Sequence, residues 1–322
     1  MTTGARRDMI ERAPLLDLAT PFARAQLAAS RALLKAPFAR ALPARDAHAL
    51  ALPRVLLTAF HRFAGVAHNA TASMLRALVP TLELAEVGEA KVDSIDPPGA
   101  QHAFADARVA IGDRNVLVRA VVLPVHWDLA AGLALRHVDA FAPELVLMSG
   151  VAAAEGPLRI ERGASNRAAL RLDASGHVRP RSRTMDAGTS LESLDEGART
   201  TLSLDVDGAL QTALRAIAKH GATEAGGVRF DAVVRGAAVG DVRDDNAYLC
   251  NQLAFVVDHA MRAGGTSLRL LRSDDAPDGV PVALPGDHRA VPRGFLHWPS
   301  ALSGAHITAG AEVLRAIVAA CL

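Results

Sequence analysis

Cys250 is the residue best suited to covalent chemistry, because a cysteine thiolate is a strong nucleophile. It lies in the segment Asp-Asp-Asn-Ala-Tyr-Leu-Cys-Asn, at the start of an apolar helix predicted over 247–261. The first turn of a helix is the positive end of its dipole, which lowers the pKa of a thiol there. Asp244 and Asp245 oppose this effect unless they cap the helix and point away. The alternative is a small buried apolar residue, as we expect for Cys321 in the last helix.

His297 and Glu161 are the residues best placed to assist such a nucleophile. His297 follows a short apolar strand in Gly-Phe-Leu-His-Trp-Pro-Ser, and open α/β sheets form their sites at the carboxyl ends of strands. Glu161 follows the short strand predicted at 158–160, and a carboxylate there can orient an imidazole. The alternatives are an ordinary surface-loop histidine and a solvated pair between Glu161 and Arg162 that contributes little energy.

Other catalytic and metal-binding motifs fail on their spacing. Residues 163–167 lack the closing glycine of a nucleophile elbow, and residues 236–240 lack the dinucleotide-binding fingerprint. The sequence has no His-Glu-x-x-His motif and no Cys/His cluster with zinc spacing. We therefore expect no metal and no other cofactor.

The composition excludes disordered, collagen-like and low-complexity proteins. Half of the 322 residues are hydrophobic and 21% are charged, so the chain has enough apolar material for a packed core. Thirty-five basic and 34 acidic residues give a net charge of +1, which provides no electrostatic reason to expect a nucleic-acid partner. Two cysteines cannot form a disulfide framework, so a reducing cytoplasm is the expected compartment. We expect no secretory signal, because no continuous apolar stretch follows the early arginines, and no membrane association, because no apolar run reaches about 18 residues.

Strand-like and helix-like segments alternate from residue 53 onward, which predicts a single α/β domain built on a layered sheet. Two segments rich in polar residues, glycine or proline are predicted to be solvent-exposed insertions, at 173–205 and 273–293. Strands are predicted at 54–60, 116–125, 144–148, 158–160, 230–235 and 294–298, and helices at 69–78, 128–137, 209–220, 247–261 and the C-terminus.

Residues 1–52 are predicted to form a helical N-terminal extension. One face of the helix carries the cations Arg24, Arg31 and Lys35. Another face carries Leu27 and Leu34. One interpretation is a helix for a membrane surface or for targeting. We favour an arm that packs on its own domain or on a second subunit, because moderate amphipathicity is normal for surface helices.

The order of Glu161, Cys250 and His297 resembles the cysteine peptidases that remove N-terminal pyroglutamate, the pyroglutamyl peptidase I (pyrrolidone-carboxylate peptidase) family. The resemblance covers residues 53–322 and has four parts. These are the opening strand with its phenylalanine-containing turn and asparagine (56–71), the glutamate signature closed by Asn166 (150–166), the nucleophile motif (247–251) and the histidine motif followed by one C-terminal helix (294–299).

The resemblance implies a fold and an activity. The fold would be a single three-layer α/β/α sandwich around a mixed, mostly parallel sheet, with residues 53–322 as the catalytic domain. The activity would be that of a hydrolase, a thiol protease of the omega-peptidase type, which releases pyroglutamyl (5-oxoprolyl) groups by proteolysis in the cytoplasm. Its partner would be an N-terminally pyroglutamylated peptide, no cofactor would be required, and the protein would form a homo-oligomer.

The resemblance also implies roles for individual residues. Cys250 would attack the acyl carbonyl, while His297 would take the thiol proton and Glu161 would orient the imidazole. The family has an arginine ten residues after the glutamate that assists at the oxyanion, and Arg171 stands there. Phe60 and Phe63 correspond to the phenylalanines that hold the lactam ring between them.

Two other functions are compatible with these residues. The first is a non-catalytic descendant of the fold that binds peptides or serves assembly, with the N-terminal arm providing contacts. The second is a cysteine amidase that uses the same machinery on another small acyl group.

Overall fold

A seven-stranded mixed sheet forms the centre of the protein. The structure is a computed structural model that describes residues 10–12, 20–37, 52–63, 66, 68–84, 96–178, 184–185, 195, 197–242 and 247–322. In spatial order the strands are β11 (Val234–Gly240), β6 (Gly156–Glu161), β14 (Arg293–Trp298), β5 (Leu145–Val151), β2 (Arg54–Phe60), β4 (Arg114–Leu123) and β3 (Ala103–Ile111).

Most neighbouring strands of this sheet are parallel. β6 is antiparallel to β14, and β3 is antiparallel to β4, so the sheet is mixed. The central strands are apolar on both faces, as β2 illustrates with six buried residues in succession, because helices cover the sheet from both sides.

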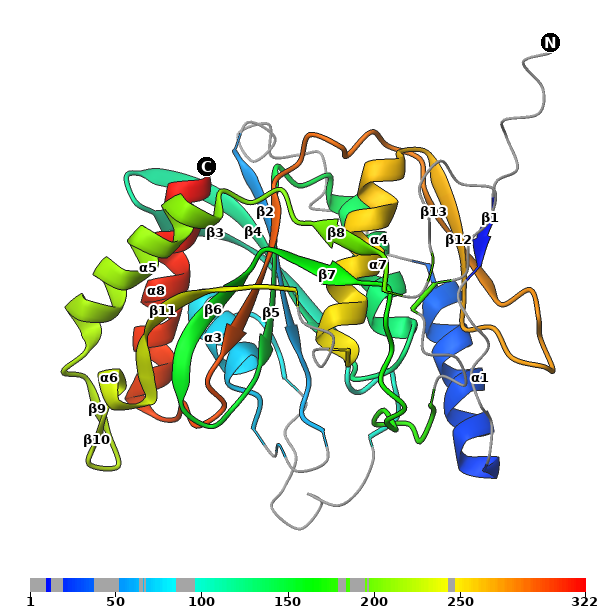
Figure 1. The fold of residues 1–322 in the computed structure, drawn as a ribbon, viewed down its shortest axis with the longest axis horizontal. Coiled ribbons are helices and arrows are strands. Elements are labelled where there is room, and N and C mark those ends of the chain that lie inside the picture. Colours follow the sequence, from blue (N-terminus) through cyan, green and yellow to red (C-terminus); the bar gives the residue numbers. More distant parts are fainter. Residues whose placement is uncertain are drawn as a thin grey trace.

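Helices on the two faces of the sheet make a three-layer α/β/α sandwich, in agreement with the predicted fold class (Figure 1). One face carries α3 (Ala70–Leu78), α5 (Val206–His220) and α8 (Ala305–Cys321), and the other carries α4 (Leu129–Phe141) and α7 (Leu249–Ala263). Each layer has its own apolar core, and Ala, Leu and Val contribute most of both cores. Local signals position several of these helices: the side chain of Asn69, for example, accepts a hydrogen bond from the Thr71 amide and caps α3.

Smaller sheets and short elements complete the described structure. α6 (Phe230–Val233) precedes β11, so the strand predicted at 230–235 is wrong for its first four residues. The remaining strands are β1 (Ile10–Arg12), β12 (Thr266–Leu270) and β13 (Val280–Leu284) in one sheet, β7 (Gly163–Ser165) with β8 (Arg199–Thr201), and β9 (Glu224–Ala225) with β10 (Val228–Arg229).

Both predicted insertions contain ordered, partly buried structure, which corrects their description as solvent-exposed. In the first, Asp173 and His177 are buried, because Asp173 accepts hydrogen bonds from the amides of Trp127 and His177. In the second, Val280 and Val282 belong to β13 and face inward.

Residues 10–12 correct the prediction that the N-terminal extension is helical throughout, because they form β1, which pairs in parallel with β12. The helix α1 (Pro21–Lys35) packs against α4 through Leu27 and Leu34, while Arg24 and Lys35 stay exposed. Arg136 Nη1 of α4 donates a hydrogen bond of 2.6 Å to the Leu34 carbonyl. The described part of the extension is therefore packed on the body of the protein, while its boundary at residue 52 stays a prediction.

Polar side chains fix the N-terminal end of α7. Asn251 Nδ2 donates to the carbonyls of Ser165 and Arg167, and its Oδ1 accepts from the Ser165 amide. Gln252 exchanges two hydrogen bonds with Asp128, a buried residue with a φ of 63° at the start of α4. Because an aspartate seldom adopts this conformation, Gln252 and the Leu271 amide, which donates to Asp128 Oδ2, hold it in place.

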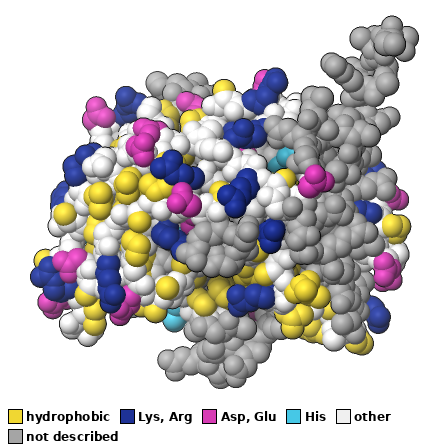
Figure 2. All heavy atoms as spheres, viewed as in Figure 1, with side chains coloured by type: hydrophobic (Ala, Val, Ile, Leu, Met, Phe, Trp, Pro, Cys, Tyr) yellow, Lys and Arg dark blue, Asp and Glu magenta, His cyan; other side chains and the backbone are white. Residues whose placement is uncertain are grey.

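The face of the molecule in Figure 2 carries basic and acidic side chains scattered among each other, in keeping with a net charge near zero. Among the described helices, none combines the length and the apolar character that crossing a bilayer would require.

A buried ion pair joins α7 to β14. Arg293 Nε donates to Asp258 Oδ1 over 2.6 Å, and the two side chains are 1% and 0% exposed. We expect Asp258→Ala to destabilise the fold by about 3–5 kcal/mol, because it leaves the Arg293 charge buried without its partner. Urea unfolding followed by circular dichroism measures the change. The matched control is Asp287→Ala, which breaks the exposed pair with Arg289 and should alter stability little. Equal effects of the two variants would contradict the prediction.

Candidate active site

Cys250 is the second residue of α7, and its sulfur lies directly against the sheet. A Cβ atom on Gly150 of β5 would be 2.7 Å from Cys250 Sγ, so only a glycine leaves room for the sulfur there. The helix begins at Leu249 with Tyr248 as its N-cap, which confirms that Cys250 is in the first turn. Asp244 and Asp245, together with Asn246, lie outside the described residues.

His297 and Glu161 form a short, buried hydrogen bond. The distance from His297 Nδ1 to Glu161 Oε1 is 2.6 Å, and both side chains are 4% exposed. Because Nδ1 is bonded to a carboxylate, it carries the proton, and Nε2 of the ring is left as an acceptor when the ring is neutral. His297 stands at the end of β14 and Glu161 at the end of β6, where both were predicted.

The strand register brings the three side chains to one face of the sheet. His297 is the partner of Gly150 across β14 and β5, and Glu161 is the partner of Phe295 across β6 and β14. Phe295 and His297 point to the same side, with ring centroids 4.8 Å apart. Since neighbouring strands are about 4.8 Å apart, the sulfur above Gly150 and the imidazole of His297 lie beside each other.

The environment of Cys250 raises its thiol pKa from 9 to about 12, in contrast to the lowering expected from the helix dipole. Burial is the main cause and the nearby Glu161 carboxylate adds to it, while Arg159 and the residue's own backbone N–H act in the opposite direction. The thiol is therefore protonated at neutral pH unless a neighbouring base takes its proton. A site of this kind suits proton transfer concerted with attack rather than a preformed thiolate.

The other predicted site residues are Phe60, Phe63 and Arg171. Phe60 is buried at the end of β2 and Phe63 is partly buried against the same core. The Arg171 guanidinium lies 5.0 Å from the ring centroid of Tyr248, and Tyr248 packs edge-on against Trp127. The substrate-binding and oxyanion roles of Phe60, Phe63 and Arg171 stay predictions.

Two residues at the site were missed by sequence reasoning. Arg159 Nε is 3.4 Å from Glu161 Oε1, and a Cβ on Gly240 would collide with Glu161 Oε2. Arg159 precedes Glu161 by two residues in a strand, and that spacing signals a shared face. Gly240 carried no such signal, because its role depends on the pairing of β11 with β6.

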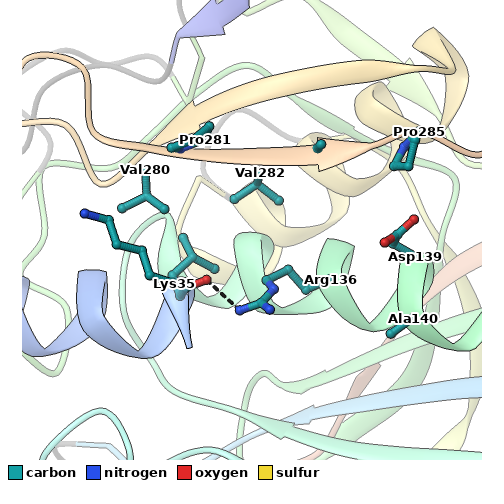
Figure 3. Close-up of a pocket in the computed structure, with 10 residues that line it drawn as sticks. Lys35, Arg136, Asp139, Ala140, Val280, Pro281, Val282 and Pro285 are labelled. Carbon is teal, nitrogen blue, oxygen red and sulfur yellow. Dashed lines mark hydrogen bonds between the residues drawn. The ribbon is translucent and has the colours of Figure 1, made fainter. Parts of the chain in front are cut away.

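A separate hollow of about 830 Å³ lies between α1, α4 and β13 (Figure 3). Lys35, Arg136 and Asp139 supply its polar lining, and Val280, Val282 and prolines of the β13 segment supply its apolar wall. Cys250, His297 and Glu161 do not line it. The described residues also contain no group of three or more His, Cys, Asp or Glu side chains arranged to hold a metal ion.

No protein-family model and no curated protein matches this sequence. Solved structures that resemble it include the pyrrolidone carboxyl peptidase from Thermococcus litoralis, with 17% identity, a TM-score of 0.49 and coverage of 84% of this chain and 93% of that one. Another is pyroglutamyl peptidase I from Bacillus amyloliquefaciens, with 17% identity, a TM-score of 0.48 and coverage of 84% and 98%. A mutant pyrrolidone carboxyl peptidase from Pyrococcus furiosus gives 15% identity, a TM-score of 0.48 and coverage of 83% and 97%. With identities and TM-scores this low, the chemistry of the site must be judged from its own residues.

Gly240→Ala should break the hydrogen bond between Glu161 and His297, because the new methyl group needs the space of the Glu161 carboxylate. The proton on His297 Nδ1 gives a far-downfield NMR signal while the bond of 2.6 Å exists, and this signal should disappear in the variant. Gly99→Ala is the control, because none of the described residues beyond its two chain neighbours has an atom within 4 Å of the added Cβ. A signal that persists unchanged in Gly240→Ala would show that the carboxylate is not confined as described.

The pH dependence of Cys250 alkylation should depend on His297. With His297 present as proton acceptor, we expect iodoacetamide to modify Cys250 near neutral pH. In His297→Gln the thiol has no base to take its proton, and burial and Glu161 still raise its pKa, so alkylation should rise only at strongly alkaline pH. Mass spectrometry of the Cys250 peptide separates this reaction from that of Cys321. Identical profiles for the two proteins would contradict a role for His297 as the base.

Proposed function

We propose that this protein is a cysteine exopeptidase that hydrolyses N-terminal pyroglutamyl groups from peptides with Cys250, His297 and Glu161 as its catalytic residues. The observation that carries the proposal is the buried pair between His297 Nδ1 and Glu161 Oε1, located one strand away from the glycine beneath the Cys250 sulfur. The resemblance of the four sequence segments to the pyroglutamyl peptidase I family suggests the acyl group.

In the first half of the reaction, Cys250 Sγ attacks the carbonyl carbon of the pyroglutamyl residue. The thiol proton passes to His297 Nε2, and the positive charge that forms on the ring is stabilised by Glu161 at Nδ1. The carbonyl oxygen becomes an oxyanion, which the backbone N–H of Cys250 at the start of α7 can help to hold. Collapse of this intermediate breaks the C–N bond, and His297 Nε2 returns a proton to the departing amine.

In the second half of the reaction, water attacks the thioester carbonyl. His297 takes a proton from the water, and the C–S bond breaks to release pyroglutamate and restore the Cys250 thiol. No redox step occurs, and no metal ion is required. The role of Glu161 in both halves is to orient the ring and to balance the charge of the imidazolium.

The lactam ring is flat and has one apolar edge, so it needs an apolar wall beside the nucleophile. Phe60 can meet this requirement. Thr58 of β2 pairs with Met148 of β5, so Phe60, two residues farther along β2, comes beside Gly150, two residues farther along β5. Phe60 belongs to the same apolar core as Phe295, on the face of the sheet that carries Cys250. We propose Phe60 and Phe63 as the ring-binding residues and Arg171 as a residue that assists at the oxyanion.

The decisive test is hydrolysis of pyroglutamyl-7-amido-4-methylcoumarin by the reduced protein. We expect release of the fluorophore by the wild-type protein and a fall of about 10⁴-fold or more in kcat for Cys250→Ser and for His297→Gln. The control is Cys321→Ser, which removes the second cysteine and should leave the rate unchanged. Prior treatment with iodoacetamide should abolish the activity in the wild-type and Cys321→Ser proteins alike.

Other outcomes of this assay identify the alternative functions. Cys250-dependent hydrolysis of other small acyl amides, with none of the pyroglutamyl substrate, would establish a cysteine amidase and overturn the acyl specificity. Absence of any Cys250-dependent hydrolysis, together with an unreactive thiol at neutral pH, would favour a non-catalytic peptide-binding protein.

A further inference from the structure

Arg159 is a charged residue of the site that the proposed mechanism does not use. It stands two residues before Glu161 in β6, so the two side chains leave the same face of the sheet. The register makes Arg159 the direct partner of His297 across β6 and β14. His297 therefore lies between Arg159 of β6 and Gly150 of β5. The Cys250 sulfur lies against Gly150.

The guanidinium of Arg159 is directed toward the Glu161 carboxylate. Arg159 Nε is 3.4 Å from Glu161 Oε1, the same oxygen that accepts the hydrogen bond from His297 Nδ1. Within the described part of the chain, this Nε atom is buried and has no hydrogen-bond partner. The side chain of Arg159 is 32% exposed while that of Glu161 is 4% exposed, so Arg159 reaches the solvent and the carboxylate that it faces is buried.

The charged and titratable groups around the Cys250 sulfur come from three elements. β6 contributes Glu161 and Arg159, β14 contributes His297, and the start of α7 contributes Tyr248, with Arg171 above its ring. Burial is the largest cause of the raised pKa of the Cys250 thiol and the Glu161 charge is the second, while the Arg159 charge lowers this pKa. Arg159 is thus an arginine whose charge favours the thiolate at this site.

We propose that Arg159 is a positioning residue of this site, whose guanidinium holds the Glu161 carboxylate on His297 and offsets the negative charge of that carboxylate at the Cys250 sulfur. The inference rests on the proposed function in taking Cys250 as the nucleophile. Glu161 is needed to orient His297, yet its charge disfavours the thiolate at the same site. A cation beside the carboxylate oxygen that binds His297 reconciles these two effects.

The test compares the pH profiles of Cys250 alkylation by iodoacetamide in the wild-type protein and in Arg159→Gln, Arg159→Lys and Arg162→Gln. Iodoacetamide is uncharged, so the substitutions do not change its attraction to the protein. We expect the profile of Arg159→Gln to shift to higher pH by about half a unit or more. Arg159→Lys should restore most of the wild-type profile, because it keeps the charge.

Arg162→Gln is the matched control. Arg162 directly follows β6, is exposed and pairs with Asp241 on the outside of the protein. Its substitution removes the same charge from the same segment and should leave the alkylation profile unchanged. A profile of Arg159→Gln that superimposes on the wild-type one, or an equal shift in Arg162→Gln, would overturn the proposal. If Arg159→Gln does not fold, Arg159→Met, which keeps the apolar stem, takes its place.

Steady-state kinetics give a second readout. If the wild-type protein hydrolyses the pyroglutamyl substrate, Arg159→Gln should lower kcat and leave KM within about twofold, because Arg159 acts through Glu161 and His297. A rise in KM with unchanged kcat would mean that Arg159 binds the substrate and would overturn the positioning role. If the wild-type protein is inactive on this substrate, the proposed function fails, while the alkylation profiles still decide the role of Arg159.

Discussion

The contact between the Cys250 sulfur and the bare backbone of Gly150 is the constraint on which the rest of the site depends. A helix that begins with its second side chain against a sheet requires a strand residue without a Cβ. A similar condition holds at Gly240, where the missing Cβ makes room for the Glu161 carboxylate. The site is thus defined as much by two absent side chains as by the side chains that carry the chemistry.

Rigid polar contacts keep this close approach in register. Asn251 and Gln252, the two residues after Cys250, bind β7 and the start of α4, so the end of the helix is held on both sides. Farther along α7, Asp258 binds Arg293 at the beginning of the strand that carries His297. The same helix therefore determines the positions of both the sulfur and the imidazole, and the distance between them cannot change without loss of buried polar interactions.

Sequence patterns predicted much of this fold, because apolar periodicity and helix caps are local properties. The strand at 54–60 and the helix at 69–78 have the predicted positions, within one residue, and the helix ending at His220 begins a few residues earlier than expected. The buried pair of His297 and Glu161 lies at the ends of two strands that pattern and motif had indicated.

The parts that could not be predicted depend on contacts between distant segments. Asp173 is buried because distant groups such as the Trp127 amide satisfy its carboxylate, and a polar composition alone suggests exposure. The thiol pKa moved in the unexpected direction because burial and Glu161 exceed the effect of a helix end, and neither is visible in the local sequence. In 280–284, by contrast, the alternation of Val280, Val282 and Leu284 was present, but the surrounding prolines and glycines obscured it.

The packing of α1 on α4 has a consequence for the limits of the folding unit. Leu34 is so close to Gly132 that a Cβ there would lie 3.0 Å from its methyl carbon, and His177 Nε2 donates a hydrogen bond to the Ala23 carbonyl. A polypeptide that started at residue 53 would expose an apolar surface along α4 to water. It would also leave the buried imidazole of His177 without its hydrogen-bond acceptor. The first helix is therefore part of the folding unit, and a shortened protein that lacks it would be prone to aggregation.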